Sequence, residues 1–116
     1  RILQNIFNAL KPGARFITTV LNACRLIRAM SDDDVHAGKL NLITMIEHSE
    51  IEITTPKGKK KVAVRERLYT PAEFVRMLRQ VGFSIDHVYG GTAGNWRREA
   101  LELDEIEFMV IAHKPE

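Results

Sequence analysis

The segment from Thr70 to Gly82 constrains the fold of this chain most strongly. Thr70 and Glu73 have the spacing of a capping box, and Pro71 takes the first helical position, where its missing N–H is not needed. Apolar residues then recur on one face of the expected helix: Phe74, Val75, Met77, Leu78 and Val81. The pattern therefore predicts a helix that buries this stripe and ends at Gly82.

A helix followed by a strand is expected at the start of the chain. Apolar side chains recur at helical spacing over residues 2–10, and Lys11-Pro12-Gly13 then stops the helix. Residues 15–21 concentrate β-branched and aromatic side chains with little polar alternation, which favours a strand covered on both faces. Helix, tight turn and strand together make half of an α/β crossover unit.

The middle of the chain has the pattern of a β-hairpin. Residues 44–54 alternate with period two, Thr55-Pro56-Lys57-Gly58 supplies a turn, and residues 61–69 return with the same alternation. We assign residues 43–69 to this antiparallel hairpin.

The C-terminal part predicts a short strand at residues 84–89 and a last buried strand at residues 106–113. The intervening residues 90–104 are rich in glycine and are interpreted as a loop. Gly90-Gly91-Thr92-Ala93-Gly94 lacks the spacing of a nucleotide-binding fingerprint and precedes no helical pattern, so we interpret these glycines as a flexible loop.

The composition limits the class of protein. The chain has 116 residues, of which 45% are apolar, and only one cysteine, which excludes a disordered tail and a disulfide scaffold and favours a single domain over residues 1–116. A net charge of +2 predicts no strong attraction to nucleic acid or to an anionic membrane. No apolar run approaches the roughly 20 residues of a bilayer span, so we expect a cytoplasmic protein.

Three segments carry a resemblance to a known family. They are residues 2–21 with their Leu10-Lys11-Pro12-Gly13 turn, residues 67–83 from Arg-Leu-Tyr-Thr-Pro to Val-Gly-Phe, and residues 108–115, which end in Ala-His-Lys-Pro. In this order they resemble the fifth strand with its preceding helix, the last crossover helix, and the closing strand of a class I, Rossmann-like S-adenosylmethionine-dependent methyltransferase. The chain is similar to the C-terminal half of such an enzyme.

The resemblance implies an α/β fold that is part of the Rossmann-like methyltransferase fold. Its expected parts are a three-stranded mixed core sheet, two principal crossover helices and the inserted hairpin at residues 43–69. It also implies that the parent protein transfers a methyl group from S-adenosylmethionine to an acceptor that the sequence does not identify. In the family the cofactor rests on a glycine-rich turn after the first strand, and that strand is not here. We therefore assign no cofactor-binding residue and expect this chain alone to be inactive.

The family's strand order implies that the strands here are the fifth, seventh and sixth. The strand around Phe16 to Val20 would then have no neighbour on its outer edge, and a long apolar edge invites pairing with another chain. The chain also begins with Arg1 in a helical pattern without an initiator Met, so we expect its start to have been cut. The expected partners are the missing N-terminal half and a second copy, through this edge or by exchange of the hairpin.

Four residues are candidates for contact with a substrate. Asn22 follows the first strand, where ligand-facing residues collect in open α/β sheets. In related methyltransferases, segments inserted after the fifth strand often cover the substrate, which points to Arg67 and Tyr69, although both also fit an ordinary surface face. Trp96 either shields the same cleft or packs on the sheet. Methyl transfer is mainly positioning of a nucleophile, so no catalytic residue is assigned.

Two other constellations have simpler explanations. Asp32, Asp34 and His36 have the alternation of metal ligands, but the segment from Ser31 also has the features of a capped turn before a short helix, and we assign no metal site. Cys24 with His36 or His48 would suit a nucleophile and its base. No local sequence feature marks an activated thiol, so a buried structural cysteine is the favoured interpretation.

The hairpin turn is rich in lysine: Lys57, Lys59, Lys60 and Lys61. This cluster suggests a further hypothesis for the function, an RNA-binding accessory domain. No aromatic residues interleave with them to stack on bases, so a solvated turn is favoured and nucleic acid is not an expected partner. The main alternative to a methyltransferase is a non-enzymatic dimerisation or binding module built on a half-fold. The methyltransferase hypothesis requires a cofactor-binding half upstream of Arg1, whereas the binding-module hypothesis does not.

Overall fold

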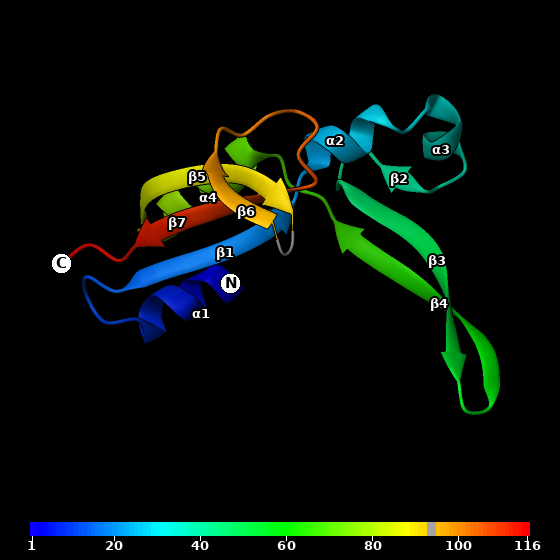
Figure 1. Ribbon diagram of the computed structural model, residues 1–116, viewed down its shortest axis with the longest axis horizontal. Helices are drawn as coiled ribbons and strands as arrows, with labels where there is room; N and C mark the ends of the chain where they lie inside the picture. Colours follow the sequence, from blue (N-terminus) through cyan, green and yellow to red (C-terminus); the bar gives the residue numbers. More distant parts are fainter. Residues whose placement is uncertain (93–94) are drawn as a thin grey trace. The chain divides into compact units, whose positions relative to one another are not determined.

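The computed structural model describes residues 1–92 and 95–116, and the chain forms two compact units. The first unit contains residues 1–28 and 69–116, and the second contains residues 29–68. The elements of the first unit, labelled in Figure 1, are α1 (Ile2–Ala9), β1 (Arg15–Leu21), α2 (Ala23–Arg28), α4 (Pro71–Val81), β5 (Ser84–Thr92), β6 (Asn95–Glu99) and β7 (Glu107–His113). No helix in the described residues is both long enough and apolar enough to cross a bilayer.

The first unit is built on a four-stranded sheet in the order β1-β7-β5-β6 (Figure 1). Each neighbouring pair is antiparallel, so β1 and β5 run in the same direction on either side of β7. The expected order of the three core strands is confirmed, and β6 is a fourth strand that the sequence did not predict. The core sheet was expected to be mixed, but in the described residues it is antiparallel throughout.

One face of this sheet carries the core. Phe108, Val110 and Ala112 of β7 are completely buried, and Phe74 and Leu78 of α4 pack against them in the same cluster. Helix α1 contributes Leu3, Ile6, Phe7 and Leu10 at its margin. The cap of α4 has the predicted geometry, because the Glu73 N–H donates to the Thr70 hydroxyl at 3.1 Å.

Strand β1 is not covered on both faces, contrary to the prediction. Its residues alternate between half-buried and exposed, and Ile17 is 54% exposed. The reason is that α1 and α4 both contribute to the cluster that holds Phe16 and Val20, the inward residues of β1, so the described helices leave its other face open. The apolar sequence of a strand does not by itself show whether one or both of its faces are packed against other segments.

The interpretation of residues 90–104 as a loop is wrong for the described residues up to 99 and is confirmed for residues 100–104. Gly90 and Gly91 lie within β5, and residues 95–99 form β6 beside it; Ala93 and Gly94 lie outside the described residues. A Cβ atom at Gly91 would lie 2.7 Å from the Trp96 ring, and one at Gly90 would lie 2.5 Å from the Glu105 side chain. These glycines are therefore required by close packing within a strand, not by loop flexibility.

The second unit is formed by α3 (Asp32–His36), β2 (Leu40–Asn41), β3 (Ile46–Thr55) and β4 (Gly58–Arg67). Its sheet has the order β2-β3-β4, with antiparallel pairing throughout. The hairpin pairs Thr55 with Gly58 across the turn, which confirms the predicted turn and alternation of faces. The short helix α3 has a capping box between Ser31 and Asp34, as the capped-turn reading expects.

Gly82 provides a test of how closely α1 packs on the end of α4. It has a φ of 123°, and a Cβ atom there would lie 2.8 Å from Cζ of Phe7. We expect Gly82→Ala to lower the free energy of unfolding by about 1 kcal/mol for the backbone and by about 1–3 kcal/mol more for overpacking. Urea unfolding followed by the fluorescence of Trp96, the single tryptophan, measures this in the first unit.

Gly13→Ala is the matched control, because Gly13 also has a positive φ, of 84°, but its Cβ atom would meet only the flexible Glu116 side chain. This variant is expected to lose only the backbone contribution of about 1 kcal/mol. Equal losses in the two variants would contradict a role for the Phe7 contact.

Candidate substrate site at the carboxyl edge of the sheet

The carboxyl ends of β1 and β5 lie at the same edge of the sheet. Glu107, the first residue of β7, is paired with Leu21 at the end of β1 and with Gly91 near the end of β5. In open α/β sheets, ligands bind outside this edge, which we call the carboxyl edge. The residues directly after the end of β1 and directly before the start of β7 therefore define the candidate site.

Asn22 organises the carboxyl edge from a fully interior position. Its side chain is buried, with 1% of the residue exposed. Its amide nitrogen donates to the Glu105 carbonyl at 3.0 Å, and its amide oxygen accepts from the Cys24 N–H at 3.1 Å. Asn22 thus caps the N-terminus of α2 and ties it to the segment before β7. Both ends of the amide are used within the chain, so its clearest role is to hold this edge together.

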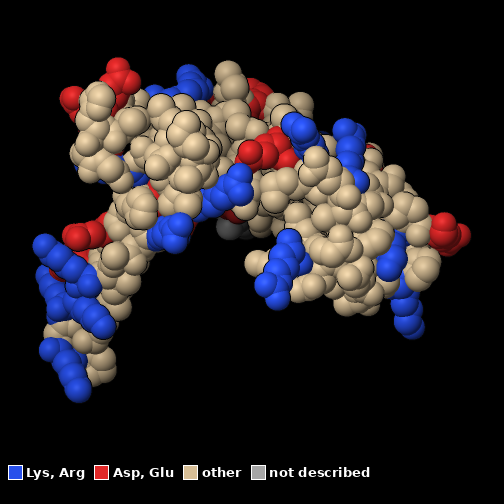
Figure 2. All heavy atoms as spheres, turned by 180° about the vertical axis from the view of Figure 1, so that it is seen from behind, with Lys and Arg blue, Asp and Glu red and all other residues tan. Residues whose placement is uncertain are grey.

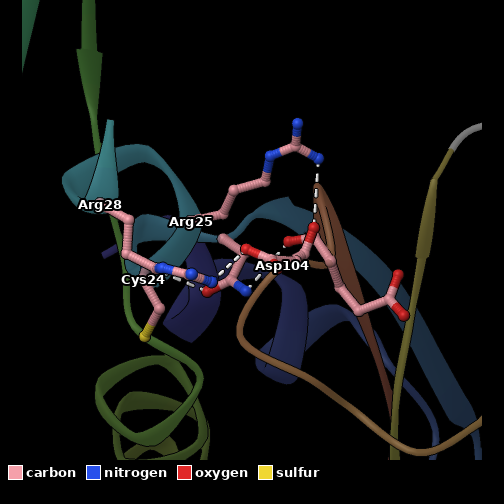
Figure 3. Close-up of polar contacts among 6 residues, drawn as sticks. Cys24, Arg25, Arg28 and Asp104 are labelled. Atoms are coloured by element: carbon pink, nitrogen blue, oxygen red, sulfur yellow. Dashed lines mark hydrogen bonds and ion pairs between the residues drawn. The ribbon is translucent and has the colours of Figure 1, made fainter. Parts of the chain in front are cut away.

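Two arginines of α2 reinforce the same connection (Figure 3). Arg25 donates from Nη1 to the Asp104 carbonyl at 3.1 Å, and Arg28 forms an ion pair with the Asp104 carboxylate. The ion pair is largely exposed, so it adds little to stability, but it orients the segment that leads into β7. The sequence did not identify these residues as part of a site. Their only sequence signal was the i, i+3 spacing of the two arginines, which places them on one face of a short helix.

Tyr69 lies beside Asn22 at the carboxyl edge. The two residues form a parallel bridge, and the Ala23 N–H donates to the Tyr69 carbonyl at 3.1 Å. The Tyr69 ring meets Phe74 edge to face, with centroids 5.6 Å apart. The structure therefore brings together two of the four predicted site residues and anchors Tyr69 to the core through α4.

The other two candidates lie elsewhere. Trp96 lies on β6, where its ring covers the backbone of Gly91, and with Tyr89 and Met109 it lines a hollow of about 190 Å³. Trp96 thus packs on the sheet, one of the two alternatives that the sequence left open. Arg67 is the last residue of β4 in the second unit, opposite Ile46. Substrate contact by any of the four residues stays a prediction.

The capping box at the start of α3 explains the acidic residues that were weighed as metal ligands, Asp32 and Asp34. The Ser31 N–H donates to the Asp34 carboxylate at 3.0 Å. This hydrogen bond, with a smaller contribution from Lys39, holds the pKa of Asp34 below its usual value. In the described residues, no three His, Cys, Asp or Glu side chains are grouped to hold a metal ion. Cys24 is half-buried on α2, whereas His36 and His48 belong to the second unit.

The described residues do not form a cradle for S-adenosylmethionine. A cofactor site of this fold class needs a glycine-rich turn whose backbone is open to the ligand. The adjacent glycines here, Gly90 and Gly91, lie in a strand and are closely packed against the side chains of Glu105 and Trp96. This glycine pair is therefore part of a packed strand and not an open turn around a ligand.

Solved structures show which fold this is. The methyltransferase CcbJ from Streptomyces caelestis superposes with a TM-score of 0.71 at 13% identity over 97% of this chain and 51% of its own. An S-adenosylmethionine-dependent methyltransferase from Methanosarcina mazei gives 0.60 at 21% identity, over 98% of this chain and 50% of its own. The glycopeptide N-methyltransferase MtfA, in complex with S-adenosylmethionine, gives 0.54 at 19% identity, over 99% of this chain and 46% of its own.

The chain therefore adopts part of the fold of S-adenosylmethionine-dependent methyltransferases and spans about half the length of these structures. No protein-family model and no curated protein matches its sequence. The fold class expected from the sequence is confirmed.

The buried amide of Asn22 predicts a measurable contrast with the exposed ion pair. We expect Asn22→Ala to lower the free energy of unfolding by about 1–3 kcal/mol, because it leaves the Cys24 N–H and the Glu105 carbonyl without their partner. Arg28→Ala removes only an exposed ion pair and is expected to cost about 0–1 kcal/mol. Urea unfolding followed by Trp96 fluorescence compares the two, and an equal loss in both variants would contradict the organising role of Asn22.

Proposed function

We propose that this chain is the C-terminal half of an S-adenosylmethionine-dependent methyltransferase and that the whole protein transfers a methyl group to an acceptor. The observation that carries the proposal is the superposition on a solved methyltransferase over 97% of the chain with a TM-score of 0.71. The order of the core strands, with the last strand of the chain between the other two, supports it.

In this proposal the described residues serve the acceptor and not the cofactor. Tyr69 lies at the carboxyl edge, with its ring held by Phe74 and its backbone bridged to Asn22. Its hydroxyl suits orientation of an acceptor, while Asn22 positions the edge. The chemistry needs a nucleophile aligned with the methyl carbon of the sulfonium, and alignment is what a fixed edge of a sheet supplies.

The proposed partner is an upstream half of the same protein, which contributes the cofactor site. Strand β1 pairs only with β7 in the described residues, and its outer edge is therefore available to a further strand. This edge is seven residues long and belongs to a strand that exposes Ile17 and Leu21, which makes it suited to pairing with a further strand. In the isolated chain the same edge is open to a second copy.

The first test is to determine the coding sequence upstream of the Arg1 codon and to measure cofactor binding. We expect roughly 100 further residues that carry a strand, a glycine-rich turn and a helix. Isothermal titration calorimetry should then detect S-adenosylmethionine binding by the whole protein and none by this chain. A reading frame without such a half, or a whole protein that does not bind the cofactor, would favour a non-enzymatic binding module instead.

A second prediction separates acceptor binding from cofactor binding in the whole protein. We expect Tyr69→Phe to lower kcat/KM for the acceptor by about tenfold, the loss of one oriented hydrogen bond, while the Kd for S-adenosylmethionine stays unchanged. The matched control is Tyr89→Phe, because Tyr89 is the only other tyrosine, and its ring stacks on His87 within β5. Equal effects of the two substitutions would contradict the assignment.

A further inference from the structure

The two faces of the β3–β4 hairpin differ in chemistry. The strand register places four opposed pairs on one face, from the base of the hairpin toward its turn: Glu47 with Glu66, Ser49 with Val64, Ile51 with Val62, and Ile53 with Lys60. We call this the isoleucine face. The opposite face, which we call the arginine face, carries the pairs Ile46 with Arg67, His48 with Arg65, Glu50 with Ala63, Glu52 with Lys61, and Thr54 with Lys59.

The arginine face is polar along most of its length and carries more basic than acidic side chains. Glu52 lies directly opposite Lys61 and forms an ion pair with Lys59 at 3.5 Å. Opposite charges at neighbouring positions stabilise an antiparallel ribbon. This face is therefore suited to contact with water.

The isoleucine face exposes apolar side chains and opposes two carboxylates. Ile51 is 49% exposed and Ile53 is 40% exposed, and Val62 and Val64 beside them are only half-buried. At the base of the hairpin Glu47 lies directly opposite Glu66, and two like charges in this position destabilise the pair of strands. The face thus has an acidic end, an apolar middle and, at Lys60, a basic end.

In the described residues, most of the hairpin has no third strand beside it to support the isoleucine face. Each strand has ten residues, but β2 pairs only with Ile46 and Glu47 of β3, so the rest of the hairpin is a two-stranded ribbon. An isolated two-stranded ribbon is marginally stable in water unless its apolar face is packed on something. A cover over the isoleucine face would stabilise the ribbon by burying its four apolar side chains.

We propose that the isoleucine face is a homodimer interface, on which the hairpin of a second copy packs in the opposite direction. The order acidic, apolar and basic is complementary to itself when reversed. Antiparallel stacking places the Lys60 end of each hairpin over the Glu47 and Glu66 end of the other and buries Ile51, Ile53, Val62 and Val64 between them. This arrangement pairs the two like-charged carboxylates with a cation and is closed by a two-fold axis.

Nucleic acid is a poorer occupant of this surface. Figure 2 shows the lysines gathered toward the turn of the hairpin, where Lys57, Lys59, Lys60 and Lys61 lie. A phosphate backbone along the isoleucine face would meet the carboxylates of Glu47 and Glu66 at one end and apolar side chains in the middle. The charge pattern therefore favours a second copy of the chain.

The test uses the chain itself in sedimentation equilibrium over a range of concentrations. We expect the wild type to dimerise and Ile51→Lys to sediment as a monomer, because the new charge lies at the centre of the apolar patch. The matched control is Ala63→Lys, which adds the same charge on the same ribbon but on the arginine face, opposite Glu50. This control should dimerise like the wild type, and circular dichroism confirms that each variant is folded.

A charge exchange tests the antiparallel arrangement itself. Lys60→Glu should raise the dimer Kd by about tenfold or more, because it places a carboxylate over Glu47 and Glu66 of the other copy. The triple variant Lys60→Glu with Glu47→Lys and Glu66→Lys exchanges the charges of the two ends completely and should recover a Kd near that of the wild type. A wild type that is monomeric at every concentration, a dimer that persists in Ile51→Lys, or a triple variant without recovery would each overturn the proposal.

The inference does not rest on the proposed enzymatic function. A dimer that survives Ile51→Lys would point to the outer edge of β1, whereas loss of the dimer in this variant leaves the cofactor question untouched. Conversely, absence of S-adenosylmethionine binding by the whole protein would not affect the hairpin interface. The two proposals therefore fail separately.

Discussion

The burial of β7 is the constraint on which the first unit depends. Phe108, Val110 and Ala112 are completely enclosed, and they lie on the strand that β1 and β5 both need as a neighbour. Because this strand is the last in the sequence and the second in the sheet, the unit closes only when the C-terminal residues insert between two strands that precede them. The cluster of aromatic rings at Phe7, Phe16 and Phe83, with centroids 5.0–5.2 Å apart, completes this core where α1 meets the sheet.

The same strand order sets the position of the candidate site. With β1 and β5 in the same direction, the residues directly after β1 and directly before β7 meet at the carboxyl edge, and Asn22 joins these two segments through its buried amide. The chain adopts about half of the methyltransferase fold, with its sheet, the helices on it and a hairpin. Gly90 and Gly91 lack the spacing of a cofactor turn, and a Cβ atom at either position would meet the side chain of Glu105 or Trp96.

The hairpin of the second unit shows that two faces of one ribbon can have different requirements although their amino acids look alike in sequence. Glutamates and lysines occur on both, but only the register decides that Glu52 opposes Lys61 while Glu47 opposes Glu66. The proposed interface with a second copy rests on this register, which exposes isoleucines in the middle of one face and opposes two like charges at its end.

Local patterns in the sequence determined the helices, the hairpin and the identity of the core strands. The Thr70 cap, the stop at Lys11-Pro12-Gly13 and the alternation of Ile51 and Ile53 each act within a few residues, which is why they were legible without the structure. Of the candidate site, the sequence located Asn22 and Tyr69 near one edge but not the arginines or Asp104 that complete it, because those contacts join residues about 80 positions apart. Only the tertiary structure decided that Gly90 and Gly91 lie under side chains in a strand and that β1 is open on one face, since both depend on which distant segments pack there.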